Sequence, residues 1–163
     1  MTKKADMINI APMTRELLHV FYKRYVPDPD ILEDRELCEP YIYDANEVDR
    51  EFDSNSAKPG RMEFAVLLDG EVIGSVGLKD IDYEKKTCEL MIHMTNDSVK
   101  NKGYGTQAEK LMIHYAFEIL GMNSVLADSL HKNTRSQHVL EKTGFQHMRD
   151  DETFRYYRMY KTC

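Results

Sequence analysis

The sequence predicts an α+β domain built around a mixed sheet, and three observations support this. The spacing of apolar residues changes from a helical period near the N-terminus to strand-like runs in the middle of the chain. The pair Asp69-Gly70 stands between two apolar runs and is a strong signal for a β-hairpin. Residues 86–130 give one strand-helix-strand unit, whose two strands should lie parallel because such crossovers join parallel strands.

The first part of the chain is expected to hold one strand and two helices. Residues 7–14 form the strand, and residues 14–26 form a helix with apolar residues at positions 17, 18, 21 and 25. Thr14 is a suitable N-cap for this helix. A second, acidic helical region should end near Asp53, and residues 54–60 are expected to be a loop because Ser, Asn, Pro and Gly dominate them.

The middle of the chain should form three strands and a long helix. Residues 61–82 are two strands joined at Asp69-Gly70. Residues 86–94 are almost continuously apolar, which is typical of a strand covered on both faces. Residues 105–120 then give a helix that Gly121 should end, with apolar residues at positions 108, 111, 112, 115, 116 and 119.

The last part of the chain completes the sheet. Residues 123–130 form a strand, and residues 133–145 form a short helix with Asn133 at or near its N-cap and Gly144 at its end. The chain closes with an antiparallel pair of strands over residues 145–151 and 153–161. The expected order is β-α-α-β-β-β-α-β-α-β-β, in a single domain covering residues 1–163.

Composition excludes several classes of function. The net charge of −6 argues against nucleic-acid binding as the main role. The chain has no apolar run near the roughly 18 residues of a membrane span, and its first residues lack the apolar core of a signal peptide, which favours a cytoplasmic protein. Neither the six histidines nor the three cysteines have metal-ligand spacing, so we expect no metal; Cys38, Cys88 and Cys163 also form no disulfide framework.

Acidic residues are concentrated in one segment. Residues 28–53 contain eleven Asp or Glu residues and only two basic residues, Arg35 and Arg50. The segment is either a solvated helix face or an acidic rim that attracts a cationic substrate.

Two glycines open the helix of residues 105–120 and raise the question of an anion site. Gly103 and Gly105 come just after Lys100 and Lys102. The N-terminus of a helix presents N–H groups without intrahelical partners, and glycines let those groups come close to a phosphate. A turn that needs glycine for structural reasons is the other interpretation.

Two nucleotide-binding patterns compete for this segment. The series Gly103, Gly105 and Ala108 formally fits the dinucleotide pattern GxGxxG/A, and Asp128 follows about 20 residues later. That pattern must follow its strand directly, whereas residues 95–102 intervene here. A Walker-type phosphate loop is excluded because Gly-Lys-Ser/Thr is missing.

The residues of this region resemble the GNAT superfamily of N-acetyltransferases. The family signature Gln/Arg-x-x-Gly-x-Gly/Ala corresponds to Lys100-Asn101-Lys102-Gly103-Tyr104-Gly105, with lysine in place of the usual glutamine or arginine. Asn133, Ser136 and the segment VLEKTGF at residues 139–145 are similar to the RimJ/RimL branch, which acetylates N-termini of ribosomal proteins. The resemblance implies the GNAT fold, a mostly antiparallel sheet of about seven strands with a splayed parallel pair and about four helices.

The same resemblance implies how acetyl-CoA would bind. The strand at residues 86–94 splays from the strand at 123–130, and the pantetheine arm inserts between them. Backbone groups near Ile92, His93 and Met94 would bond it, as in edge-strand pairing. Asn133 either caps its helix or bonds the pantetheine arm, and both can hold together. The diphosphate would lie on the N–H groups from Lys100 to Thr106, including those of Asn101, Lys102, Gly103, Tyr104 and Gly105.

Acetyl transfer to an amine needs a base and a group that stabilises the oxyanion. A lysine-like amine has a pKa near 10.4, so only about one molecule in 10³ is neutral at pH 7. Glu89 stands eleven residues before Lys100, the spacing of the catalytic glutamate in histone-acetylating members, and is the candidate base. By resemblance the backbone N–H of His93 would bind the oxyanion. The rings of His93 and His131 are further candidates, although strand histidines are more often packed in the core.

The leaving thiolate benefits from a nearby proton donor. Many family members place a tyrosine where this chain has Leu140, so that donor is absent. In the RimL-like branch the serine of Asn-x-x-Ser is the partner of the sulfur, which corresponds to Ser136. A first-turn serine also commonly bonds its own backbone, which is the structural alternative.

The sequence therefore predicts an acetyl-CoA-dependent N-acetyltransferase that acts on a primary amine. The acceptor is a peptide or protein N-terminus, an aminoglycoside, a polyamine or an amino acid, and the enzyme is a monomer or homodimer. A non-catalytic acetyl-CoA-binding sensor or interaction module is the alternative, because Lys100 and Leu140 depart from the family pattern. A dinucleotide oxidoreductase is a third hypothesis.

Overall fold

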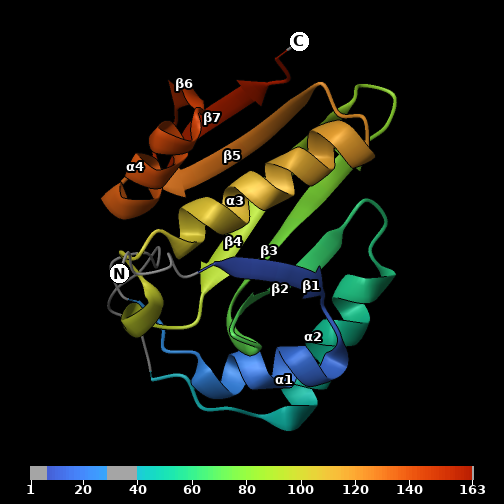
Figure 1. The fold of residues 1–163 in the computed structure, drawn as a ribbon, viewed down its shortest axis with the longest axis vertical. Coiled ribbons are helices and arrows are strands. Elements are labelled where there is room, and N and C mark those ends of the chain that lie inside the picture. Colours follow the sequence, from blue (N-terminus) through green and yellow to red (C-terminus); the bar gives the residue numbers. More distant parts are fainter. Residues whose placement is uncertain (1–6, 29–39, 163) are drawn as a thin grey trace, which may run out of the picture.

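The computed structural model describes residues 7–28 and 40–162, and it confirms the α+β class. A seven-stranded sheet has the order β1-β2-β3-β4-β5-β7-β6, and the described residues also form four α-helices. The ribbon in Figure 1 shows α3 lying across the sheet, with α4 near one end and α1 and α2 near the other. The order of elements is the one that the sequence predicts.

The N-terminal elements agree with the prediction except at the end of the second helix. β1 (Ile8–Pro12) is followed by α1 (Arg15–Arg24), whose first turn is capped by the Thr14 hydroxyl, which accepts a hydrogen bond from the Leu17 N–H at 3.2 Å. Further along, α2 (Ala45–Ala57) continues through residues predicted to be a loop. Part of the predicted acidic helical region, residues 29–39, lies outside the described residues.

The correction at the end of α2 has a local physical cause. Asp44 caps the start of α2 by accepting bonds from the N–H groups of Asn46 and Glu47. Ser and Asn are weak helix formers, but they do not stop a helix that has already begun. Lys58 takes an extended conformation, as a residue before proline prefers, so Pro59 ends the helix rather than the Ser and Asn residues before it.

The predicted hairpin is confirmed. β2 (Met62–Leu68) and β3 (Glu71–Asp82) pair antiparallel, with Asp69 and Gly70 both at positive φ, 50° and 81°. Two positive φ values are what a type I′ turn requires, and the twist of that turn matches the strands. β4 (Thr87–Met94) then pairs antiparallel with β3.

The helix predicted at residues 105–120 is divided in two. α3 (Tyr104–His114) continues into a π-helical segment, η3 (Tyr115–Ile119), in which the Leu120 N–H bonds the carbonyl of Tyr115. Ala116 and Phe117 in this segment are both buried. A sequence period of 3.6 cannot distinguish this local widening from a continuous α-helix.

The C-terminal elements are as expected. β5 (Ser124–Leu130) and α4 (Thr134–Thr143) precede the antiparallel pair β6 (Gln146–Asp150) and β7 (Phe154–Tyr160). The Asn133 side chain caps α4, and Gly144 ends it at a φ of 116°. The left-handed conformation at Gly144 is the usual helix C-cap and favours glycine.

The predicted parallel pair is confirmed and is very short. β4 and β5 are in register only at Thr87–Glu89 against Ser124–Leu126. Beyond Glu89 the two strands no longer pair, although each continues for several residues. The sheet is therefore open between the C-terminal halves of these two strands.

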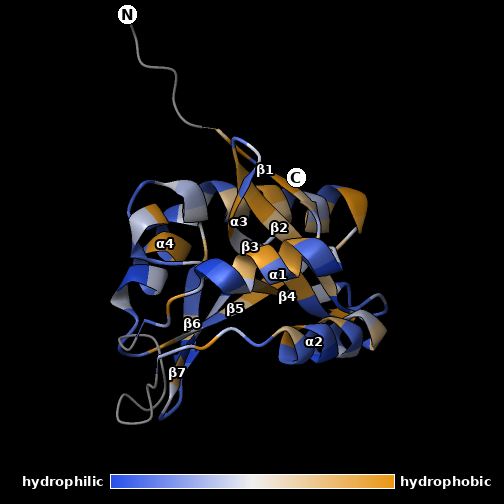
Figure 2. Ribbon diagram, turned by 90° about the horizontal axis from the view of Figure 1, so that it is seen from below, coloured by the Kyte–Doolittle hydropathy of each residue, from blue (hydrophilic) through white to orange (hydrophobic). Residues whose placement is uncertain are grey.

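Helices lie on both sides of the sheet, and hydrophobic residues are frequent in the strands between them (Figure 2). On the side of α3 and α4, Cys88 and Leu90 of β4 pack in one cluster with Ala108 and Met112 of α3. On the other side, the buried residues of α1 and α2 are Leu18, Phe21 and Val48. The prediction that β4 is covered on both faces is therefore only partly met. Cys88 and Leu90 are buried on the α3 face, whereas on the other face Met91 is half-buried and His93 is exposed.

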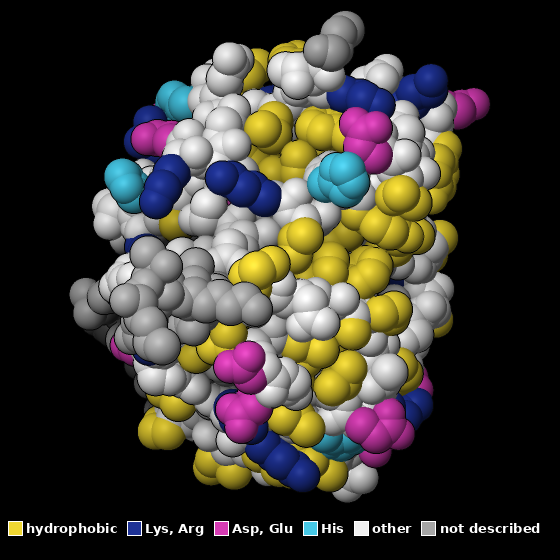
Figure 3. Space-filling model, in the orientation of Figure 1, with side chains coloured by type: hydrophobic (Ala, Val, Ile, Leu, Met, Phe, Trp, Pro, Cys, Tyr) yellow, Lys and Arg dark blue, Asp and Glu magenta, His cyan; other side chains and the backbone are white. Residues whose placement is uncertain are grey.

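The outer surface on the α3 side is partly apolar. Figure 3 shows apolar side chains across the middle of this face, with most charged side chains toward its edges. Leu111 and Ile119 are among the exposed large apolar residues. Among the helices in the described ranges, none combines the length and the apolar character that crossing a membrane requires.

Replacing Gly77 with alanine should destabilise the fold strongly. An added Cβ would lie 2.2 Å from the carbonyl oxygen of Met62, so the β2–β3 pair would have to move. We expect a loss of about 2–3 kcal/mol or more in the free energy of unfolding, measured by urea titration. Gly105→Ala is the matched control, because its Cβ would meet only Ile92 Cδ1 at 3.9 Å. Equal stability of the two variants would contradict this packing.

Candidate functional site

A pocket of about 320 Å³ lies where β4 and β5 diverge. Its walls come from the end of β4, the loop that follows it, the first turns of α3 and the first turns of α4. Nine of the residues predicted from the sequence line this pocket: Ile92, His93, Met94, Lys100, Asn101, Gly103, Gly105, Asn133 and Ser136. The structure therefore brings together two motifs that are about 30 residues apart in the chain.

Two helices begin at this pocket. α3 is preceded by Gly103, which adopts a φ of 80° and has no side chain with which to cap the helix. At α4 the side-chain oxygen Oδ1 of Asn133 accepts a bond from the Ser136 N–H at 3.1 Å, so its predicted role as N-cap is confirmed. Each helix N-terminus carries a partial positive charge, so the pocket favours an anionic ligand.

Three residues of the predicted diphosphate loop do not line the pocket. The Tyr104 side chain is buried in the core cluster with Ala108, so only its backbone faces this region. Lys102 is exposed, and Thr106 is half-buried in the first turn of α3. These residues could serve a ligand through their backbone N–H groups, as the sequence prediction requires.

The lysine of the predicted anion loop is already ion-paired. Lys100 Nζ lies 3.1 Å from Asp28 Oδ2 and 3.2 Å from Asp97 Oδ1. The Lys100 and Asp28 side chains are both only 12% exposed, so this pair is partly desolvated. Arg135 also approaches Asp97, at 3.7 Å. Sequence reasoning missed Asp28, because 72 residues separate it from Lys100 and no local pattern links them.

The candidate base Glu89 is not part of the pocket. It is the last residue of β4 that pairs with β5, and its side chain forms an ion pair of 3.1 Å with Lys79 on β3. Burial raises the pKa of Glu89, Lys79 opposes this shift, and the neighbouring Asp128 carboxylate adds to it. Because side chains alternate along a strand, Glu89 and His93 share the face opposite to α3.

His93 connects this face to the pocket. It lines the pocket and is exposed, and desolvation by the nearby protein nevertheless lowers the pKa of its ring. Glu63 opposes the shift, while Arg61 and Lys79 add to it. The imidazole is therefore neutral at pH 7, in which state it can accept a proton or a hydrogen bond.

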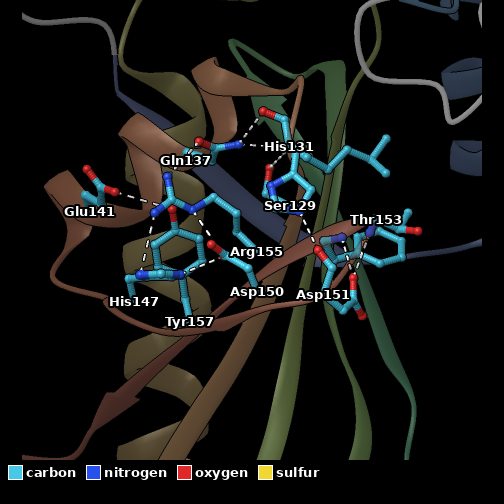
Figure 4. Close-up of polar contacts among 12 residues, drawn as sticks. Ser129, His131, Gln137, Glu141, His147, Asp150, Asp151, Thr153, Arg155 and Tyr157 are labelled. Atoms are coloured by element: carbon cyan, nitrogen blue, oxygen red, sulfur yellow. Dashed lines mark hydrogen bonds and ion pairs between the residues drawn. The ribbon is translucent and has the colours of Figure 1, made fainter.

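His131 belongs to a structural contact instead. Its ring Nε2 lies 2.7 Å from the carbonyl oxygen of Asp151, and its backbone N–H bonds the carbonyl of Thr153. Figure 4 shows these contacts beside the Gln137 side chain, whose amide donates to the carbonyls of Leu130 and His131. The His131 ring therefore ties the end of β5 to the turn between β6 and β7 and does not line the pocket.

A buried glutamate in the pocket wall was not predicted. Glu109 on α3 is 1% exposed, burial raises its pKa to about 7, and its Oε2 lies 3.2 Å from the Thr143 hydroxyl oxygen. Its position offers a signal that could have revealed it, because Glu109 precedes the buried residues Met112 and Ile113 by three and four positions. Residues with that spacing share one face of a helix.

The described residues form no group of side chains that could bind a metal ion. No group of three or more His, Cys, Asp or Glu side chains within residues 7–28 and 40–162 is arranged to hold a metal ion. Cys88 is a buried free thiol in the core, where burial raises its pKa to about 12. It is therefore a packing residue rather than a nucleophile.

Comparison with protein sequences and comparison with solved structures both indicate the same fold. A model of the acetyltransferase (GNAT) domain matches residues 8–146. The spermidine N(1)-acetyltransferase of Escherichia coli K12 is 28% identical over 94 residues, which cover 58% of this chain and 50% of that protein. YdaF of Bacillus subtilis, which carries the provisional name of a ribosomal N-acetyltransferase, is 31% identical over 84 residues, 52% of this chain and 45% of its own. The chain spans about half the length of the curated relatives it matches.

Solved structures share the fold at low sequence identity. The spermidine N-acetyltransferase of Vibrio cholerae, solved with CoA and spermine, has a TM-score of 0.75 and 18% identity over 94% of this chain and 95% of its own. The N-acetyltransferase PseH of Campylobacter jejuni has a TM-score of 0.72 and 19% identity over 95% and 99% of the two chains. With a family model covering most of its length and the splayed parallel pair at its centre, the chain belongs to the GNAT acetyltransferase superfamily.

Proposed function

We propose that this protein is a single-domain N-acetyltransferase that transfers an acetyl group from acetyl-CoA to a primary amine. The observation that carries the proposal is the pocket between the diverging strands β4 and β5, with two helix N-termini at its wall. Family membership and the CoA-bound structure of a neighbour with the same fold support it.

The shape of the pocket fits a narrow chain with a diphosphate. Beyond Glu89 the edge of β4 has no paired strand on the β5 side, so its backbone at Ile92, His93 and Met94 can bond a ligand inserted there. Around Gly103 there is open space, since a Cβ added to it would meet no atom within 4 Å. The diphosphate would lie on the N–H groups from Lys100 to Thr106, as the sequence predicts.

Protein groups near the diverging strands can support each part of the reaction. The His93 backbone N–H would stabilise the oxyanion, and such a donor contributes about 2.7–4 kcal/mol. Ser136 lines the pocket and would donate a proton or hydrogen bond to the leaving sulfur. Because Glu89 lies outside the pocket, it would take the proton of the amine through water along the face that it shares with His93.

The acceptor side is proposed to take a cationic amine. The relatives named above include spermidine acetyltransferases and a ribosomal-type enzyme, so polyamines and protein N-termini are the first acceptors to test. Near the pocket residue Tyr25, aromatic and acidic side chains gather between α1 and α2, where Tyr22 donates to Glu51 at 2.8 Å. Membership of the RimJ/RimL branch, a cytoplasmic location and a monomer or homodimer remain predictions; one neighbour, from Vibrio cholerae, is described as a dodecamer.

A non-catalytic acetyl-CoA-binding module is the second candidate. The predicted base forms an ion pair with Lys79 and does not line the pocket, which is the observation that favours this alternative. Release of coenzyme A from acetyl-CoA in the presence of spermidine, an N-terminal peptide or an aminoglycoside, followed with a thiol reagent, separates the two. Coenzyme A binding without release in any mixture would favour the module.

Lys100→Met should weaken coenzyme A binding about tenfold to a hundredfold. One charge-assisted contact is worth about 1.5–3 kcal/mol, and the wild-type lysine must exchange its carboxylate partners for the phosphate. Calorimetric titration measures the affinity, and a melting curve checks the fold because the ion pair between Lys100 and Asp28 is lost. Lys110→Met, which alters an exposed lysine of α3, is the control. Equal affinity of both variants would remove Lys100 from the site.

Glu89→Gln should lower kcat by about a hundredfold or more while coenzyme A affinity stays the same, because only the base is lost. Lys79 lowers the pKa of Glu89, so Lys79→Met should raise that pKa and move the acid limb of the pH–rate profile to higher pH. Rates at high pH should be retained in Lys79→Met. Unchanged turnover in Glu89→Gln would exclude Glu89 from the mechanism.

A further inference from the structure

Glu109 is a buried acid in the wall of the pocket to which the proposed function assigns no role. It lies one helical turn after Gly105 on α3, and both residues line the pocket. α4 packs beside α3 at this point and presents Thr143 and Val139. The carboxyl group is thus enclosed between two helices, with the pocket as its opening.

The hydrogen bonds of Thr143 indicate the protonation state of Glu109. Thr143 Oγ1 lies 2.7 Å from the carbonyl oxygen of Val139 and 3.2 Å from Glu109 Oε2. A hydroxyl has a single proton, and a carbonyl oxygen can only accept. The proton therefore points to Val139 at the shorter distance, and the longer contact is satisfied when a protonated Glu109 donates to Oγ1. Turning the hydroxyl toward an ionised Glu109 would break the bond to Val139.

No cation in the described part of the chain compensates a charge on Glu109. No Lys or Arg of the described residues forms an ion pair with the Glu109 carboxyl group, and no neighbouring charge contributes to the shift of its pKa. The β4 residues that line the same pocket as Glu109 include Ile92 and His93, and the His93 ring is neutral at pH 7. Four other charged residues line the pocket: Asp28, Lys100, Lys132 and Arg135. Of these, Lys100 and Arg135 form ion pairs with carboxylates. Further charged residues nearby in the chain are Lys102 before α3, Lys110 on α3, and Glu141 and Lys142 on α4.

We propose that Glu109 is a positioning residue of the cofactor site that must carry its proton for coenzyme A to bind. The inference rests on the proposed function. An ionised Glu109 would add a negative charge that no ion pair of its own offsets to a pocket that takes a ligand with several phosphate charges. The protonated group instead keeps the wall neutral and holds α3 to α4 through Thr143. Its pKa near 7 places this requirement within the physiological range.

The test compares coenzyme A binding to wild type, Glu109→Gln and Glu118→Gln by calorimetry between pH 6 and 8.5. Glutamine keeps the size of the side chain and its capacity to donate to Thr143, but it cannot ionise. Glu118 is an exposed glutamate further along the same helical element and is the matched control. Titration of coenzyme A itself is common to all three proteins and cancels in their ratios.

In wild type and Glu118→Gln, affinity should fall about tenfold per pH unit above the pKa of Glu109, relative to Glu109→Gln. Titration in two buffers of different ionisation enthalpy should show uptake of up to about one proton by wild type at pH 8, and none of it in Glu109→Gln. Equal slopes in all three proteins would overturn the inference about Glu109 alone. Absence of coenzyme A binding to wild type at every pH would overturn the proposed function and this inference with it.

The stability of the free protein supplies a second measurement. The folded pKa of Glu109, about 7, is above its ordinary value of 4.5, so the folded state holds the proton more tightly than the unfolded chain. Stability from this group is fully present below pH 4.5 and is lost as the pH rises through about 7. The melting temperature of wild type should fall relative to Glu109→Gln across this window and run parallel above it. Parallel curves throughout would show that Glu109 is already ionised and would overturn the proposal.

Discussion

The separation of β4 from β5 after Glu89 is the constraint on which the site depends. Buried backbone N–H and C=O groups need partners, and a sheet normally supplies them from the next strand. Here three paired positions hold the strands together at one end, and the rest of the β4 edge is left to another partner. The loop after β4 and the start of α4 lie at this open end, so donors from both meet around the gap.

The positive charge at the gap is balanced by carboxylates from distant parts of the chain. Asp28 follows α1, and its pairing with Lys100 joins the helix on one face of the sheet to the loop that begins α3. Two more contacts support the same junction: the Val26 N–H bonds the carbonyl of Thr95, and the Asn96 amide donates to the carbonyl of Arg24. A ligand that draws Lys100 away from Asp28 would therefore act on the end of α1 as well, which links the two faces of the sheet.

Two glutamates with raised pKa values lie on opposite sides of β4, and their surroundings differ. Glu89 has Lys79 within ion-pair distance, so its charged form is supported despite burial. Glu109 is buried and has no cation as an ion-pair partner among the described residues, so burial favours its neutral form. Burial alone would describe both residues in the same way. The presence of a cation decides which of them can serve as a base and which remains a neutral part of a wall.

Local signals in the sequence determined the elements of this fold and the motifs of its site. The Asp69-Gly70 turn, the Thr14 cap and the glycine after α4 each act within a few residues, so the sequence was sufficient to place them. The predicted end of the second helix was wrong because Pro59, rather than the weak helix formers before it, terminates α2.

Only the tertiary structure decided which side chains share a space. The pairing of Asp28 with Lys100, the position of Glu89 outside the pocket and the enclosure of Glu109 all depend on contacts between distant elements. Hydrophobic period and turn chemistry describe one element at a time, whereas a pKa or an ion pair depends on what other elements place around the group. The sequence alone therefore determined the elements and the family motifs, while the charge state and role of each acid were decided by packing.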